Sequence, residues 1–240
     1  MTEMIRRYLR QKLASLGVLV ALGVIALVTA FTLAVSGGER GLETGFVSLL
    51  LLAAASVSKD ASGGALQMIL ARPLTRTDYL FGRYLGILAA YASFLAACAL
   101  IAYALATVFL PLFGLERTPV SAPALLRGFG AGMLGAVLPA AVLLFFSTFL
   151  PGYADVLAYF LLMIALPVPG LLGQALRKPW LERVSALAKE NVLPEVRWEQ
   201  VFGGKEVLGA ATGRWALAVA VFLVAAAAVF SRREFAYGQD

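Results

Sequence analysis

The chain has 240 residues, of which 61% are hydrophobic and 14% are charged, and its formal net charge is +6. A soluble globular domain carries about 45–50% apolar and about 25% charged residues. A water-soluble fold of this length cannot bury so much apolar surface, so the composition excludes a soluble enzyme and a disordered chain. The solvent must be lipid. In a membrane protein a positive net charge indicates basic cytoplasmic loops rather than nucleic-acid binding.

The N-terminal segment, residues 1–13, has the pattern of a basic amphipathic helix. Its apolar residues share one face at helical spacing, and three arginines lie off that face: Met4, Ile5, Tyr8 and Leu9 against Arg6, Arg7 and Arg10. A helix of this kind lies in the headgroup layer of a membrane. The alternative is a basic tail without fixed structure that only sets the topology.

Six apolar stretches predict membrane-spanning helices, and they make the whole chain, 1–240, a single all-α transmembrane domain. A spanning helix needs roughly 20 apolar residues, and a shorter one borrows flanking positions. The second and sixth stretches are the short ones. The expected spans are residues 14–36, 42–58, 80–112, 126–150, 154–175 and 212–231.

The basic residues indicate how these spans are oriented. Arginines precede the first span and follow the last, and the 59–83 connection is also basic, so both termini are expected in the cytoplasm. The cytoplasmic membrane is then the expected location. Six spans place the basic loop at 177–211 outside, against this rule. A re-entrant segment near Pro167 and Pro169 is the alternative, because it would move that loop inside.

The connection at residues 59–79 is too polar to cross a membrane. Within it, Leu66, Ile69 and Leu70 fall at i, i+3 and i+4, which predicts a short helix with one apolar face. Arg72 precedes Pro73 and ends that helix, since a residue before proline avoids the α region. An isolated helix this short is marginal in water, so it must pack on the spans of this chain or on a partner.

Small residues recur at every fourth position of the fourth span, namely Gly128, Gly132, Ala136 and Ala140. Such a stripe lets two helices approach closely, either within the chain or at a dimer interface. After this span Pro151 and Gly152 predict a tight turn, so spans four and five form an antiparallel hairpin. Asp155 is expected to cap the fifth span rather than to act in transport.

The loop at 177–211 is expected to be helical. Trp180, Leu181, Val184, Leu187 and Ala188 form an apolar stripe, and all three tryptophans of the chain lie in or beside the loop. We therefore expect one or two interfacial helices on the outer face, joined near Pro194.

The sequence has no constellation for catalysis, metal binding or nucleotide binding. It contains no histidine and one cysteine, Cys98. Residues 35–39 look like the signature motif of ABC ATPases, but no phosphate loop accompanies them. The expected span interiors hold no ionisable residue, which argues against a proton-coupled carrier. Polar span residues are candidates for lining a path, although each also fits simple helix packing: Tyr91, Tyr103, Ser147 and Tyr159.

A membrane protein without an energy source of its own, yet with a structured cytoplasmic segment, resembles one family. Residues 58–83, SKDASGGALQMILARPLTRTDYLFGR, resemble the segment after the second span of type-2 ABC exporter permeases. Asp60 stands at that family's acidic position, Ile69-Leu70 at its leucine pair and Thr75-Arg76 at its Ser-Arg. Gly64-Ala65 replaces Gly-Thr, and Gly82-Arg83 replaces Gly-Lys.

The resemblance implies a coupling helix that docks on a separate ATPase subunit. Its contacts would be three apolar anchors and three charged residues at the rim: Leu66, Ile69 and Leu70 with Asp60, Arg72 and Arg76. The family further implies two ATPase copies that bind ATP and Mg, and a second permease copy that makes a homodimer. This chain itself would need no cofactor and bind no nucleic acid.

Two other functions stay open at this stage. One is a scaffold that transmits ATPase strokes to periplasmic partners without transporting a substrate; the large outer loop and the few polar span residues favour it. The other is a membrane-embedded transferase, which would need clustered intramembrane acids or histidines that the sequence lacks. The substrate is not indicated, although an apolar path would suit lipids, hydrophobic drugs or peptides.

Overall fold

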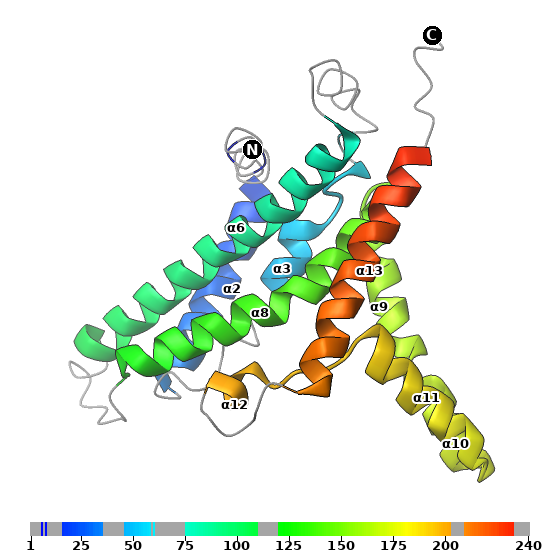
Figure 1. Cartoon of the computed structure of the whole chain (residues 1–240). Helices are drawn as coiled ribbons and strands as arrows, with labels where there is room; N and C mark the ends of the chain where they lie inside the picture. Colours follow the sequence, from blue (N-terminus) through cyan, green and yellow to red (C-terminus); the bar gives the residue numbers. More distant parts are fainter. Residues whose placement is uncertain are drawn as a thin grey trace. The chain divides into compact units, whose positions relative to one another are not determined.

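The computed structural model describes residues 6, 8, 16–35, 46–58, 60, 75–109, 120–202 and 209–232, and every regular element in these ranges is a helix (Figure 1). The expected all-α fold is therefore confirmed for the described part of the chain. The helices are α2 (Leu16–Val35), α3 (Phe46–Ala53), α6 (Arg76–Ala104), the π-helical η2 (Leu105–Phe109), α8 (Ala122–Ser147), α9 (Ala154–Ala165), α10 (Val168–Leu176), α11 (Pro179–Val192), α12 (Trp198–Phe202) and α13 (Ala210–Arg232).

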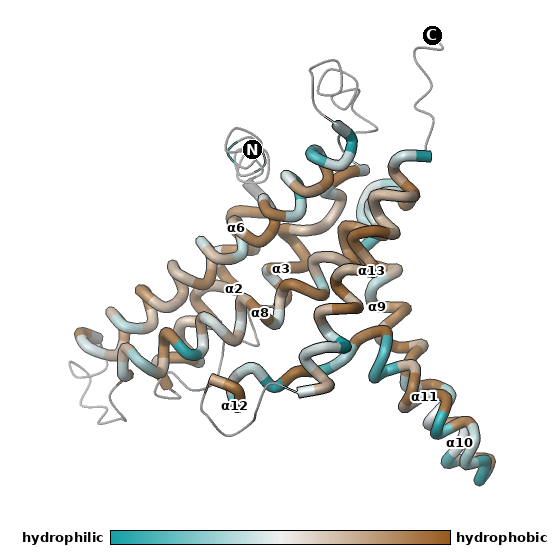
Figure 2. Tube along the Cα trace, in the orientation of Figure 1, coloured by the Kyte–Doolittle hydropathy of each residue, from teal (hydrophilic) through white to brown (hydrophobic). Residues whose placement is uncertain are grey.

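Five stretches of helix are long and apolar enough to cross a membrane: Gly17–Val35, Arg76–Val108, Ala122–Ser147, Ala154–Leu176 and Ala210–Arg232. In Figure 2 these helices are mostly brown, with teal residues toward their ends. Their outward faces are apolar as well. In α13, for example, Leu217, Val221 and Val224 are exposed at helical spacing. Helices with such faces belong to a membrane protein, because lipid rather than water can cover them.

The expected second span, 42–58, differs from this pattern. In its described residues the helix α3 has 8 residues, Phe46–Ala53. A helix of that length rises about 12 Å, less than half of the ~30 Å hydrocarbon core. Turns follow at residues 54–57, and Ala55 has a left-handed φ of 53°. The second of the six expected spans therefore stays a prediction.

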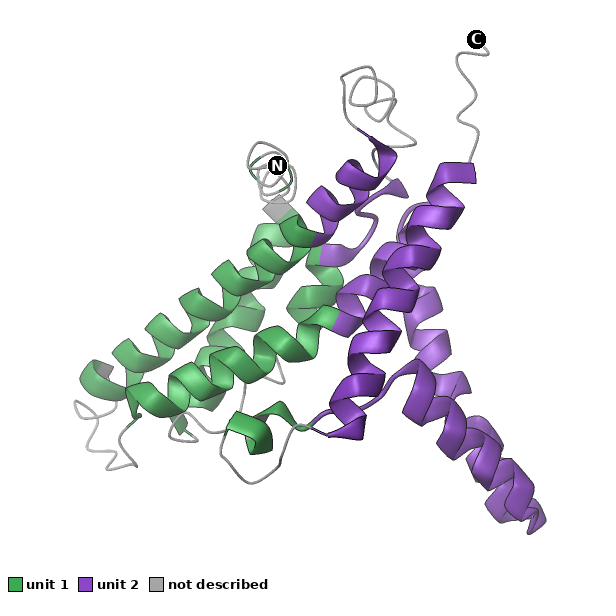
Figure 3. Ribbon diagram, in the orientation of Figure 1, with its two compact units in different colours: residues 1–52, 85–137, 197–207 green, residues 53–84, 138–196, 208–240 purple. Residues whose placement is uncertain are grey.

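Contacts between residues divide the chain into two compact units (Figure 3). Unit 1 contains residues 1–52, 85–137 and 197–207, and unit 2 contains residues 53–84, 138–196 and 208–240. Helices α6 and α8 each contribute residues to both units.

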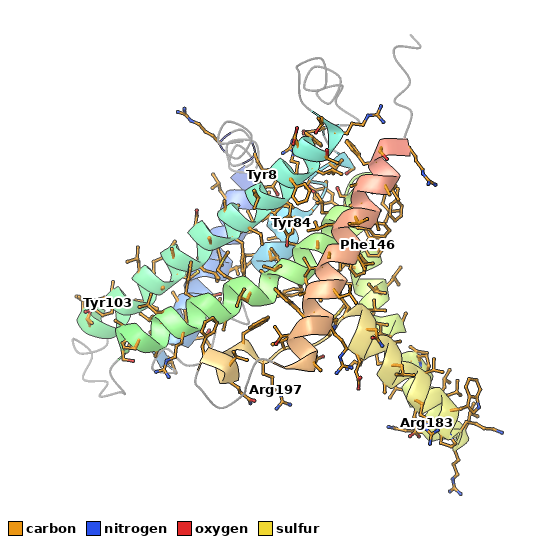
Figure 4. All side chains as sticks on the ribbon, in the orientation of Figure 1. Tyr8, Tyr84, Tyr103, Phe146, Arg183 and Arg197 are labelled. Carbon is orange, nitrogen blue, oxygen red and sulfur yellow. The ribbon has the colours of Figure 1, made fainter. Side chains whose placement is uncertain are left out.

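In unit 1, α2 packs against η2, and Tyr8 is fully buried. The Tyr8 hydroxyl donates to the Leu52 carbonyl, and its ring lies on Gly86, where an added Cβ would be 3.2 Å from the ring (Tyr8 is labelled in Figure 4). Arg6 and Tyr8 are both helical, with Arg6 exposed and Tyr8 fully buried. The rest of the expected helix at 1–13 lies outside the described residues.

The short helix α12 also packs in unit 1. Its Phe202 ring covers Gly130 of α8, where an added Cβ would lie 3.2 Å from the ring. Trp198, at the start of α12, is buried, with 7% of its surface exposed. Helices α11 and α12 thus occupy the 177–211 segment on either side of Pro194. The side of the membrane on which they lie stays a prediction.

Unit 2 is built around the turn between α8 and α9, which lies where Pro151 and Gly152 predict it. Gly152 has a φ of +58°, a conformation that glycine adopts without strain. An aromatic cluster connects the end of α8 to α13, with Phe145 5.8 Å from Phe222 and 5.2 Å from Phe149 between ring centroids.

Helices α10 and α11 of unit 2 form an antiparallel hairpin (Figure 1). The chain reverses at Arg177, whose φ of 52° is left-handed, and the N–H of Lys178 donates to the Gly173 carbonyl (2.8 Å). This is a Schellman motif, which satisfies the last carbonyls of a helix. The helices can approach closely at Gly173 because it has no side chain: an added Cβ would lie 2.9 Å from the Glu182 nitrogen.

Candidate functional site

The candidate site lies in unit 2, where α3 leads into the expected coupling segment. We call the described residues between them, Ala54–Ser58 and Asp60, the junction. The helix breaks here, so backbone N–H groups that a continuous α-helix would satisfy need other partners. Ser147 at the end of α8 and Asp155 at the start of α9 accept three of these N–H groups, while side chains of α6 bond the carboxylate of Asp60. The junction is buried, with Val57, Ser58 and Asp60 at most 5% exposed.

Asp155 holds the start of the junction. Its carboxylate accepts the N–H of Ala55 on Oδ2 (2.7 Å) and the N–H of Val156 on Oδ1 (2.8 Å). The side chain is fully buried in the first turn of α9, where the positive end of the helix dipole favours an anion. Asp155 therefore connects residues a hundred positions apart. The N-cap itself is Tyr153, which makes no capping bond, so Asp155 lies two positions inside the cap position expected for it.

Ser147 and Ser58 hold the middle of the junction. The Ser147 hydroxyl accepts the N–H of Val57 (3.0 Å) and the N–H of Ser58 (3.4 Å). The Ser58 hydroxyl donates to the carbonyl of Gly152 (3.2 Å). The turn after α3 is thus fastened to the α8–α9 turn by side chains on both sides.

Asp60, Tyr79 and Arg83 hold the end of the junction, and we call these three residues the clamp. Asp60 pairs with Arg83, and the two side chains are only 3% and 6% exposed. The Tyr79 hydroxyl donates to Asp60 Oδ2 (2.8 Å) and accepts a hydrogen bond from Arg83 Nε (3.2 Å). Buried charges need an opposite charge and hydrogen-bond partners of this kind, since burying an unpaired ion costs several kcal/mol.

One buried polar atom of the junction has no hydrogen-bond partner. Among the described residues, Ser56 Oγ is the buried side-chain atom that lacks a hydrogen-bond partner, and Ser56 is 3% exposed. Such an orphan costs about 1–3 kcal/mol relative to a satisfied group. The junction thus retains some local frustration.

The expected ATPase-coupling residues fall into two groups. Leu66, Ile69, Leu70 and Arg72 lie outside the described residues. Asp60 and Arg76 are described, and both have partners within this chain. Asp60 is in the clamp, and Arg76 Nη1 donates to the carbonyl of Ser231 at the end of α13 (2.7 Å). Their expected contact with an ATPase stays a prediction.

The candidate path-lining residues differ in exposure. Tyr91 and Tyr159 are each 3% exposed and Ser147 is fully buried, whereas Tyr103 of α6 is 49% exposed. The hydroxyl of Ser147 is occupied by the junction. Packing accounts for the three buried residues, and their role in a path stays a prediction.

The small-residue stripe of α8 is largely buried within the chain. Gly128 is buried, Gly132 is half-buried, and Ala136 and Ala140 are 2% and 0% exposed. This burial fits the intramolecular alternative for the stripe, in which close helix approach needs no second copy. The dimer alternative stays a prediction.

Sequence reasoning did not single out Tyr79, Arg83, Asp155 or Ser58 as a connected set. A partial signal exists, because Tyr79 and Arg83 lie one helical turn apart and therefore share a face of α6. Asp155 carries no local signal of its contact with Ala55, since the two residues lie a hundred positions apart in the sequence and meet only through the packing of unit 2.

Comparisons of the chain with protein-family models, with curated proteins and with solved structures find no match. In the described part of the chain, no three His, Cys, Asp or Glu side chains are grouped so that they could hold a metal ion. The features of this chain that bear on its function are therefore the junction and the sequence of the segment that follows it.

Proposed function

We propose that this chain is the membrane-spanning permease subunit of a type-2 ABC exporter. It would lie in the cytoplasmic membrane with both termini in the cytoplasm and with six spans, the second formed around α3. A separate ATPase, in two copies, would bind ATP and Mg and dock on the coupling segment. A second permease copy would complete the transporter.

The observation that carries the proposal is the resemblance of residues 58–83 combined with the way the described ends of this segment are held. A segment that receives a mechanical stroke must be fastened to the helices that it moves. Asp60, at its start, is buried against α6, and the turn before it is bonded to the α8–α9 turn. This attachment supports a coupling role for residues 61–74.

The test is retention of the ATPase after the apolar anchors are changed. Leu66→Asp combined with Leu70→Asp should abolish co-purification of the ATPase from native membranes, because a charged face cannot enter an apolar groove. Membrane insertion should be unchanged. Thr77→Asp is the matched control, since it adds a carboxylate at the exposed start of α6, where a helix tolerates negative charge.

Two results would contradict the proposal. If the doubly substituted chain retains the ATPase at wild-type stoichiometry, residues 66–70 do not dock it. If no ATPase co-purifies with the unsubstituted chain either, the assignment to an ABC exporter is wrong.

A second candidate function is a scaffold that transmits ATPase strokes to a periplasmic partner. The observation that favours it is helix α11 of the α10–α11 hairpin, where Trp180, Val184 and Leu187 are 47–60% exposed. Reconstituted vesicles distinguish the two functions. ATP-dependent flux of a lipid, a hydrophobic drug or a peptide supports the exporter, whereas ATP-dependent crosslinking of the hairpin to a periplasmic protein without flux supports the scaffold.

A further inference from the structure

The two described ends of the coupling segment meet at one place. Asp60 is the last described residue before residues 61–74, and Thr75 and then α6, from Arg76, follow them. The pairing of Asp60 with Arg83 and the hydrogen bond from Tyr79 bring these ends together. Asp60 and α6, which flank residues 61–74 in the sequence, are therefore bonded directly to each other.

The clamp also reaches the C-terminal end of α13. The Tyr79 ring stacks on Phe230, with centroids 5.7 Å apart and planes inclined by 17°. One turn earlier, Arg76 Nη1 donates to the Ser231 carbonyl (2.7 Å), where a cation is favoured at the negative end of a helix dipole. Tyr79 thus takes part in both contacts: its hydroxyl bonds Asp60, and its ring packs on α13.

We propose that Asp60, Tyr79 and Arg83 are positioning residues that convert movement of the coupling segment into joint movement of the start of α6 and the end of α13. This inference rests on the proposed function, because the stroke comes from the ATPase. A buried and fully satisfied ion pair suits the task, since it breaks less readily than an exposed pair. Rigid helices then carry the displacement into the membrane.

The first experiment needs no ATPase and tests the clamp as a unit. Melting temperatures of the whole chain in lipid nanodiscs are compared for Asp60→Asn, Arg83→Gln and the double variant. Each single change should lower the melting temperature by about 6 °C or more, because it leaves one buried partner unmatched. The double variant should lose clearly less than the sum of the two. Additive losses would overturn the clamp.

The second experiment measures movement in the complex with the co-purified ATPase. Spin labels replace exposed residues of unit 2 in a Cys98→Ala background: Phe81 on α6, Leu161 on α9 and Val224 on α13. Trapping with ATP and vanadate should change the distance from label 81 to label 161. The distance from label 81 to label 224 should stay constant, because the clamp moves α6 and α13 together.

Breaking the clamp should uncouple this movement without releasing the ATPase. Asp60→Asn should abolish the 81–161 change while the ATPase stays bound and hydrolyses ATP. Tyr79→Phe keeps the stacked ring and removes only the hydroxyl, so it folds even if Asp60→Asn does not, and it should reduce the change. Asp60→Arg with Arg83→Asp should restore it. The control Asp78→Asn changes an exposed acid of the same helix turn that bonds Thr75, and it should leave the change intact.

The results separate the two proposals. If Asp60→Asn retains the full 81–161 change, the clamp does not transmit the stroke, although the exporter assignment can still stand. If no ATPase binds the unsubstituted chain, the exporter assignment fails and the transmission role fails with it, while the melting temperatures still report on the ion pair.

Discussion

The junction and the α10–α11 hairpin belong to the same unit but handle their polar groups in opposite ways. The junction buries Asp60, Arg83 and Asp155 and gives each a specific partner. The hairpin keeps its charges outside, as with the side chain of Arg183 (labelled in Figure 4), and it also exposes Leu172 and Trp180.

The ion pairs of the two regions show the physical consequence. Arg214 pairs with Glu190 at the base of the hairpin with side chains 40% and 53% exposed, whereas Arg83 and Asp60 are 6% and 3% exposed. Solvent screens the first pair and contributes a competing hydration shell. The buried pair of Arg83 and Asp60 has no water to replace a lost partner. The junction is therefore specified by polar contacts, and the hairpin by steric fit between glycines and the facing helix.

The largest expected effect tests the two ion pairs against each other. Arg83→Gln should destabilise the protein by about 3–5 kcal/mol, because Asp60 is left buried without its counter-ion. Arg214→Gln should cost less than about 1 kcal/mol, since its pair is exposed. Unfolding by SDS titration in mixed micelles measures both. Equal losses would mean that the burial of the two pairs does not set their strength.

The next effect concerns the steric fit of the hairpin. Gly173→Val should cost about 2 kcal/mol, because its Cβ would collide with the Glu182 backbone nitrogen 2.9 Å away and force α10 and α11 apart. Gly135→Ala in α8 is the matched control, since nothing lies within 4 Å of its added Cβ. The same titration should find the control neutral or slightly more stable. A tolerated Gly173→Val would refute close helix contact as the basis of the hairpin.

A smaller effect compares two buried serines. Ser147→Ala leaves the N–H groups of Val57 and Ser58 without an acceptor and should cost about 1–2 kcal/mol. Ser185→Ala in the hairpin removes a single donor to the Leu166 carbonyl, a bond of 2.8 Å, and should cost about 0.5–1 kcal/mol. Amide hydrogen exchange should accelerate at Val57 in the first variant only. Unchanged exchange there would show that Ser147 does not hold the junction.

The smallest effect is at the orphan hydroxyl. Ser56→Ala should leave stability unchanged or raise it by up to about 1 kcal/mol, since it removes a buried oxygen that has no partner. Ser58→Ala, two residues further along the chain, removes the bond to the Gly152 carbonyl and should be destabilising. A marked loss in Ser56→Ala would show that this hydroxyl is satisfied in the membrane-embedded protein.

Much of the fold could be predicted from the sequence, because a long apolar run in lipid must form a helix to satisfy its backbone. Five of the six expected spans have counterparts among the described helices, with ends that differ by a few residues. The turn at Pro151 and Gly152 was also predictable, because the chemistry of a turn is local. The short α3 was not, since its helix ends in an apolar sequence without proline or glycine, and the break depends on bonds from Asp155 and Ser147.

The candidate site was predictable only as a segment. The charges of residues 59–83 indicated a polar element between spans, and Asp60 and Arg76 were expected to face a partner. Their contacts with Arg83 and with the end of α13 join positions 23 and 155 residues apart in the chain (Asp60 to Arg83, and Arg76 to Ser231). No local pattern carries such contacts, because they depend on which helices become neighbours.

Composition and hydropathy are enough to predict a membrane protein built of helices, and the described helices agree with that prediction. These properties follow from local chemistry, since each apolar run must satisfy its own backbone in lipid. The tertiary structure decides which polar residues are buried together, and therefore where the few charged residues of the chain lie. Asp60, Arg83 and Asp155 lie in the interior because packing supplies partners that neutralise their burial cost, and that pairing places the candidate site at the junction.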